Sequence, residues 1–183
     1  LLDQPEEFAK ELAVKVEPYT IGSQNIFASQ TNVDLSSKFV IFNIKRLDEK
    51  LKPFAMKVIL DQIWNQVVIN QGKVTTWLFF DELHRNYAND DNARWFMKLW
   101  SRVRKYGAIP TGITQNIATL LDDPEGRKMI SNSEFFVFLR QKKVDLLSLQ
   151  NIINIPTNLL SYVGEKVERG TGLISSGGVV VPF

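Results

Sequence analysis

The sequence has 183 residues, 44% of them hydrophobic, and its 22 basic and 20 acidic residues give a net charge of +2. This length is enough for one compact domain, and so small a charge argues against a protein that binds polyanions over its whole surface. The absence of cysteine excludes disulfides and thiol chemistry, and a single histidine, His84, disfavours Ser–His triads and His-rich metal sites.

The first residues, Leu-Leu-Asp-Gln-Pro, show neither an initiator methionine nor the layout of a signal peptide, so we expect the chain to be cut from a longer protein. No apolar run approaches the roughly 20 residues that cross a bilayer. Pro5 and the acids around it predict a helix over residues 3–16. A proline and a glycine then predict a polar loop over residues 18–37.

From residue 38 onward, short apolar runs alternate with helical patterns, and we treat the chain as one unit. The predicted elements are a strand at 38–44, a helix at 53–70, a strand at 74–80, a helix at 90–106, a strand at 108–114, a short helix from 124, a strand at 135–139, short helices near 143–150 and 157–163, and a hairpin of 172–174 with 179–181 around a turn at 175–178. This alternation indicates an α/β fold with a parallel sheet that is covered on both faces.

Two adjacent acids follow the predicted strand at 74–80. Asp81 and Glu82 come directly after Phe79 and Phe80, and reactive side chains gather beyond the carboxyl ends of parallel strands. Such a pair suits the hydrolysis of a nucleoside triphosphate, in which one acid holds Mg²⁺ and the other orients or deprotonates the attacking water. A strand end whose acids cap the next turn is an equally open interpretation of this string alone.

The next predicted strand ends in Thr114-Gln115-Asn116. A side-chain amide at this position suits the sensing of a γ-phosphate or the positioning of a water molecule. The alternative is that Gln115 and Asn116 only begin a loop. Because this string follows Asp81 and Glu82 by one strand–helix unit, its order favours the functional interpretation.

The helix between these two strands carries basic residues on one face, Arg94, Lys98, Arg102 and Lys105. A solvated face is the simpler interpretation, and a face that binds an anion is the alternative. Arg104, at the end of the helix, has the further alternative of reaching a neighbouring subunit's phosphate as an arginine finger.

A lone histidine in a turn is more often structural than catalytic, so His84 receives no role. An ordinary surface position is the simpler interpretation of Arg140.

The sequence contains no phosphate-binding loop of the form G-x-x-x-x-G-K-[ST]. Glycines 107 and 112, and glycines 172 and 177, have the required spacing, but Ile113 and Gly178 follow them in place of lysine. Both pairs also come after the Asp81 strand, whereas the loop belongs before it. Either the protein is no ATPase, or the loop lies upstream of Leu1.

Taken in order, three strings resemble the later motor motifs of type IV secretion ATPases of the VirB/TraC type, in the HerA–FtsK branch of P-loop NTPases. They are Trp77–Leu83, Arg104–Gly107 and Thr114–Asn116. Gly170–Ile174, Val180–Phe183 and Thr31–Leu35 are similar to the family as well, so the resemblance covers the chain from about Pro18 to Phe183. Asn43 departs from the family pattern, in which Asp is common.

The resemblance implies a RecA-like parallel sheet flanked by helices, with a C-terminal β-hairpin. Residues 1–37 would be a lead-in of helix and loop, and residues 38–183 the core, so that 1–183 form the C-terminal portion of an ATPase domain. It implies a motor subunit, working as a hexameric ring with ATP and Mg²⁺, that powers DNA or protein transfer or pilus assembly. Implied partners are further copies, other type IV secretion subunits and DNA. The implied location is the cytoplasmic face of the inner membrane, which the protein would reach through its partners.

Carried over residue by residue, the resemblance makes Asp81 the Walker B acid, which contacts the nucleotide site and holds Mg²⁺ through water. Glu82 would be the catalytic glutamate, Gln115 the nucleotide sensor and Arg104 the arginine finger. Without the loop, these 183 residues alone are expected to bind ATP poorly and to be inactive.

The alternative function is a non-catalytic docking module of NTPase fold, which binds secretion partners or DNA through the basic helix face.

Overall fold

The computed structural model describes residues 3–23, 25, 28–30, 33–86, 90–115, 117–142, 146, 150 and 154–183. Asn116, residues 31 and 32, and most of the helix expected near 143–150 lie outside the described residues. By its contacts the chain divides into two compact units, Leu1–Gln66 and Val67–Phe183, and the boundary falls inside a helix.

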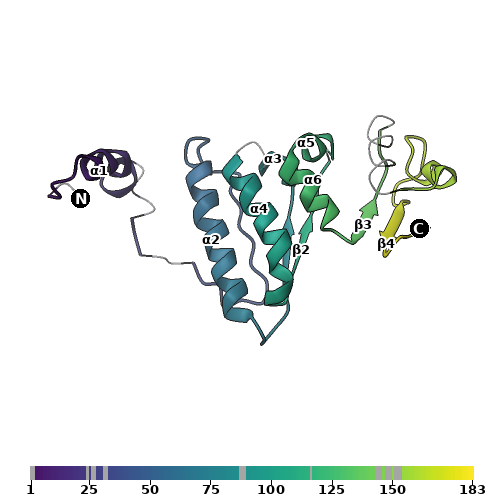
Figure 1. The fold of residues 1–183 in the computed structure, drawn as a ribbon, viewed down its shortest axis with the longest axis horizontal. Coiled ribbons are helices and arrows are strands. Elements are labelled where there is room, and N and C mark those ends of the chain that lie inside the picture. The colour runs from purple at the N-terminus through teal and green to yellow at the C-terminus, as the bar shows by residue number, and fades with distance from the viewer. Residues whose placement is uncertain are drawn as a thin grey trace. The chain divides into compact units, whose positions relative to one another are not determined.

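Figure 1 shows the helices and strands in chain order. They are α1 (Glu7–Thr20), α2 (Lys52–Asn70), β1 (Thr76–Phe80), α3 (Leu83–Asn86), α4 (Asp90–Arg102), the 3₁₀ helix η2 (Val103–Tyr106), β2 (Ala108–Gly112), α5 (Ile117–Asp122), α6 (Pro124–Ser131), β3 (Phe135–Phe138), the 3₁₀ helix η3 (Thr157–Tyr162), β4 (Leu173–Ser176) and β5 (Val179–Pro182). None of the described helices combines the length and the apolar character that crossing a membrane requires.

Helix α1 differs from the predicted helix at both ends. It begins after Glu6 and continues through Pro18 into the predicted loop. Pro18 has no N–H group to donate to the carbonyl of Val14, which removes one helical hydrogen bond. The helix nevertheless continues past it and ends where the N–H groups of Ile21 and Gly22 both donate to the carbonyl of Glu17. A proline in the last turn therefore did not mark the end of this helix.

The strand predicted at residues 38–44 is absent. These residues form no ladder with any described segment, and Phe39 and Ile41 are 76% and 74% exposed. β-branched and aromatic residues favour a strand only where a neighbouring strand pairs their N–H and C=O groups. Asn43 instead accepts a 3.0 Å hydrogen bond from the N–H of Lys45.

In the same unit, hydrogen bonds from Ser36 lower the pKa of Asp34.

Strands β1 and β2 form the predicted parallel pair, with Thr76 opposite Ala108 and Phe80 opposite Gly112. One face of this pair is covered by α4, since the ring of Phe80 lies 5.0 Å from that of Phe96. The other face is exposed within the described residues, because Trp77 is 60% exposed. The expectation of a sheet covered on both faces was therefore wrong for this part of the chain.

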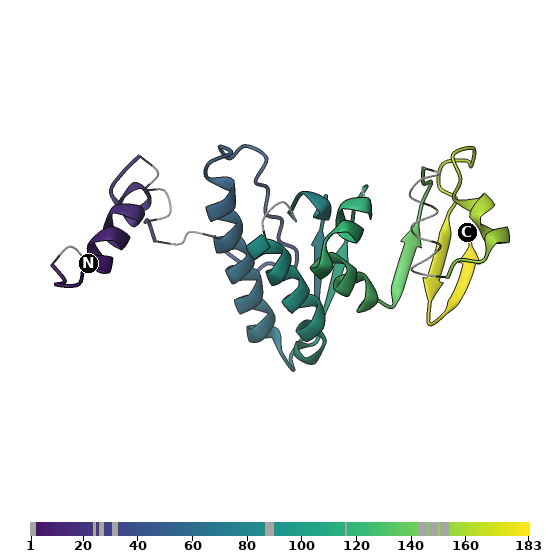
Figure 2. The same ribbon diagram turned by 45° about the horizontal axis from the view of Figure 1, so that its top comes forward.

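Helix α4 provides much of the core around β1 and β2, and it lies beside α6 in the views of Figures 1 and 2. Phe96 and Leu99 are fully buried, and burial of each side chain contributes about 1.5–3 kcal/mol. The indole N–H of Trp100 donates to the hydroxyl of Ser133 at 3.1 Å, just beyond the end of α6. As predicted, the helical segment stops at Gly107, whose φ is +70°.

The C-terminal strands form a second sheet, in the order β3-β4-β5. All its pairs are antiparallel, so the expectation that 135–139 joins the parallel sheet was wrong, because an apolar run alone does not identify its partner. The predicted hairpin is confirmed. Its turn is Gly177-Gly178, with φ values of +56° and +81°, a conformation that glycine adopts without strain.

Candidate functional site

The ends of β1 and β2 remain paired beyond the two strands. The N–H of Ile113 donates to the carbonyl of Phe80, and the N–H of Leu83 donates to the carbonyl of Ile113, both at 2.9 Å. These bonds hold the residues after β1 against the residues after β2. Asp81 and Glu82 therefore lie at the same sheet edge as Gln115.

The carboxylate of Glu82 is the centre of this edge. Its Oε1 accepts a hydrogen bond from Nε2 of Gln115 at 2.8 Å. Its Oε2 lies 3.3 Å from Nε of Arg85 and 3.5 Å from Nε2 of His84. The structure thus brings together two residues that the sequence analysis placed at the site, Glu82 and Gln115.

The backbone at Glu82 has an unusual conformation. Its φ of +49° is in the left-handed region, which non-glycine residues seldom occupy and which costs of order 1–3 kcal/mol. Such conformations persist where the surroundings fix them, and they are frequent at functional sites. Here the turn is fixed by Leu83, which is 1% exposed, and by the hydrogen bond from the Glu82 N–H to Oδ1 of Asp81 at 2.9 Å.

Asp81 is the residue for which the sequence analysis expected a magnesium ion. Among the described residues, no three His, Cys, Asp or Glu side chains are grouped so that they could hold a metal. Magnesium in nucleotide sites is commonly bound by one or two carboxylates together with phosphates and water. The exposed carboxylate of Asp81, at the end of β1, fits this type of site.

Arg104 lies at the other end of the same strands. It belongs to η2, directly before Gly107, whose carbonyl accepts from the N–H of Thr76 at the start of β1. Since β1 has five residues, the two ends are roughly 16 Å apart. Arg104 is therefore outside the cluster around Glu82 in its own chain.

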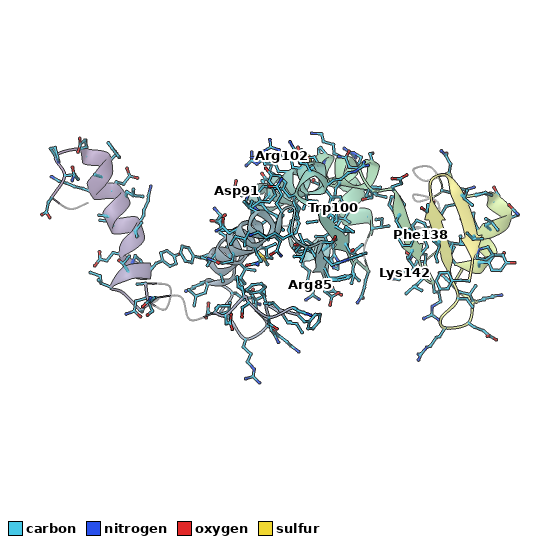
Figure 3. The ribbon with its side chains drawn as sticks, turned by 90° about the horizontal axis from the view of Figure 1, so that it is seen from below. Arg85, Asp91, Trp100, Arg102, Phe138 and Lys142 are labelled. Atoms are coloured by element: carbon cyan, nitrogen blue, oxygen red, sulfur yellow. The ribbon has the colours of Figure 1, made fainter. Side chains whose placement is uncertain are left out.

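Arg85 contacts Glu82 at this site, and Figure 3 shows it on the opposite side of the structure from Arg102, the last residue of α4. Sequence analysis missed the contacts of both His84 and Arg85 with Glu82. The spacing of three residues between Glu82 and Arg85 was an available signal, because side chains three apart meet on a helical turn. No such signal existed for His84, whose contact depends on the left-handed backbone at Glu82.

The basic face of α4 lies at the surface, which both a solvated face and an anion-binding face require. Arg94, Lys98 and Arg102 are all exposed, and Arg94 forms an ion pair with Asp91 at 3.0 Å. Exposed pairs of this kind contribute about 0–1 kcal/mol.

Gly112 permits the close packing behind Glu82, and we expect Gly112→Ala to disturb it. A Cβ atom at this position would lie 2.5 Å from Cδ2 of the buried Leu83. Overpacking of this kind lowers the free energy of unfolding by about 1–3 kcal/mol, which urea unfolding would measure. Gly164→Ala is the control, because its nearest neighbour would be the carbonyl oxygen of Leu160 at 3.7 Å. Equal stability of the two variants would contradict the tight contact.

The sequence matches no known protein family and no curated protein. The structure is similar to that of VirB4 of Thermoanaerobacter pseudethanolicus, with a TM-score of 0.78 and 21% sequence identity. The likeness covers 100% of this chain and 50% of that one, so the chain spans about half the length of the protein it matches. The two share a fold, which confirms the predicted α/β class with a parallel sheet, helices and a C-terminal β-hairpin, and in the described residues that parallel sheet consists of β1 and β2.

Proposed function

We propose that this chain is part of the motor domain of an ATPase of the type IV secretion kind, and that Asp81, Glu82 and Gln115 form its hydrolytic edge. The observation that carries the proposal is the 2.8 Å hydrogen bond between Gln115 and Glu82 at the paired ends of β1 and β2. The order of the sequence motifs and the fold shared with VirB4 support it.

In this proposal Glu82 acts on the water that attacks the γ-phosphate of ATP. Its carboxylate orients the water and accepts a proton as the water oxygen bonds to phosphorus and the bond to the ADP oxygen breaks, which yields ADP and phosphate. Gln115 senses the γ-phosphate from the neighbouring strand. Asp81 would hold Mg²⁺ through water, and this ion, when bound, neutralises charge on the phosphates.

The phosphate-binding loop would come from outside these 183 residues, because their sequence contains no G-x-x-x-x-G-K-[ST] string. The fact that the chain spans 50% of the VirB4 chain is compatible with such a contribution. The active unit would be a ring of copies, a hexamer, in contact with other secretion subunits and DNA at the cytoplasmic face of the inner membrane.

The test is the magnesium dependence of hydrolysis by the full-length protein that carries this chain. Asp81→Asn should raise the Mg²⁺ concentration for half-maximal ATP hydrolysis by about 10–100-fold, the usual effect of losing a group that holds a metal through another ligand. Asp61→Asn, at an exposed position of α2, is the control and should behave as wild type. An unchanged magnesium requirement in Asp81→Asn would contradict the role of Asp81. A protein that hydrolyses no ATP but binds DNA in a strongly salt-dependent way would support the docking module instead.

A further inference from the structure

We propose that His84 is a positioning residue, which links the end of β2 to the carboxylate of Glu82. Its Nδ1 lies 2.9 Å from the hydroxyl of Thr114, and its Nε2 lies 3.5 Å from Oε2 of Glu82. The inference rests on the proposed function, because it assigns His84 a task in holding the base of that reaction.

The direction of these contacts depends on which ring nitrogen of His84 carries the hydrogen. An ionised carboxylate only accepts hydrogen bonds, so we assign the hydrogen of a neutral imidazole to Nε2, which lies at an electrostatic contact distance of 3.5 Å from Oε2 of Glu82. Nδ1 then accepts the hydroxyl hydrogen of Thr114. Because Gln115 follows Thr114 directly, the two carboxylate oxygens of Glu82 are held from adjacent residues of one strand end, Oε1 through Gln115 and Oε2 through His84.

Burial favours His84 over Arg85 as the group that holds Oε2. The side chain of His84 is 17% exposed, whereas that of Arg85 is 77% exposed. An exposed ion pair is screened by water and allows the arginine to leave at little cost. The histidine ring, by contrast, follows the buried Leu83 and is fixed by Thr114, so it supports one orientation of the carboxylate.

This support matters because Gln115 has two tasks in the proposed reaction. Its amide nitrogen donates one of its two hydrogens to Oε1 of Glu82, and a turn of the side chain toward the nucleotide would withdraw that contact. When Gln115 engages the nucleotide, the contact of His84 with Oε2 keeps the carboxylate in place. The orientation of a general base is critical, since a displacement of about 1 Å can lower the rate about 10²-fold.

The experiment compares variants of the full-length protein in steady-state ATP hydrolysis. His84→Ala and Thr114→Val should each lower kcat by about 10–100-fold, with the KM for ATP within about twofold of wild type, because only the orientation of Glu82 is lost. His84→Gln should recover part of kcat, since its amide N–H can donate to Glu82. The double variant His84→Ala/Thr114→Val should be no slower than the slower single variant, as expected for groups that act as one unit.

Two further variants make the result decisive. Lys128→Ala, which removes an exposed ion pair with Glu125 on α6, should keep the wild-type kcat. Glu82→Gln is measured in the same series, and hydrolysis that persists in it overturns the proposed function itself. If Glu82→Gln is inactive while His84→Ala and Thr114→Val keep full kcat or add their effects, only the role of His84 is overturned. Should His84→Ala fail to fold, Thr114→Val, which keeps the ring, decides the question.

Discussion

Glu82→Gln is expected to lower ATP turnover by the full-length protein by about 10²–10⁴-fold, the usual contribution of a positioned general base. Glutamine has the same shape as glutamate and keeps an oxygen that can accept from Gln115, so the turn after β1 should persist. It cannot take a proton from water, however, and the chemical step should fail. Phosphate release would measure the turnover, and equilibrium binding of a fluorescent ATP analogue would show that the affinity for nucleotide is preserved.

The matched control for this variant is Glu134→Gln, which makes the same change at an exposed glutamate before β3. It should leave both turnover and nucleotide binding unchanged. Turnover near the wild-type rate in Glu82→Gln would remove Glu82 from the reaction. Loss of nucleotide binding together with turnover would indicate instead that Glu82 supports the structure of the site.

The meeting of Glu82 and Gln115 was predictable from the sequence for a simple reason. Parallel strands end at one edge of their sheet, so residues that follow two neighbouring strands must lie close together. The register of β1 with β2 places Phe80 opposite Gly112, and the side chains three positions beyond Gly112 then reach those beyond Phe80. Local signals were equally sufficient for the stop at Gly107 and for the turn at Gly177-Gly178.

The errors concern interactions that local sequence does not encode. Residues 38–44 have the composition of a strand, but without a pairing partner among the described residues Phe39 and Ile41 remain exposed. The run at 135–139 is a strand, yet its partner β4 lies far along the chain and antiparallel to it, which apolar composition cannot reveal. The contact of His84 with Glu82 depends on the left-handed backbone at Glu82. A glutamate gives no sequence signal for that backbone conformation.

The second large effect is expected for Arg104→Ala. Arg104 is exposed and lies at the opposite end of β1 and β2 from Glu82, so the proposed role in hydrolysis would place it at the site of another subunit. An arginine finger contributes about 10³–10⁵ in rate, and the variant should therefore lose at least about 10³-fold in turnover while it still assembles and binds ATP. Steady-state phosphate release from the assembled protein would measure this, and Lys105→Ala, the neighbouring cation, is the control. If Arg104→Ala keeps its activity, the finger lies elsewhere, and Arg102 and Arg140 are the next to test.

Mixing Arg104→Ala with Glu82→Gln separates action between subunits from action within one. Each variant alone should be inactive, because every site lacks either the base or the finger. In a mixed ring, an interface that joins Glu82 of the first variant to Arg104 of the second contains both groups, so part of the turnover should return. If Arg104 instead served its own chain, no subunit would hold both groups and the mixture would stay inactive. Recovered turnover would therefore show that a second copy completes the site at Glu82.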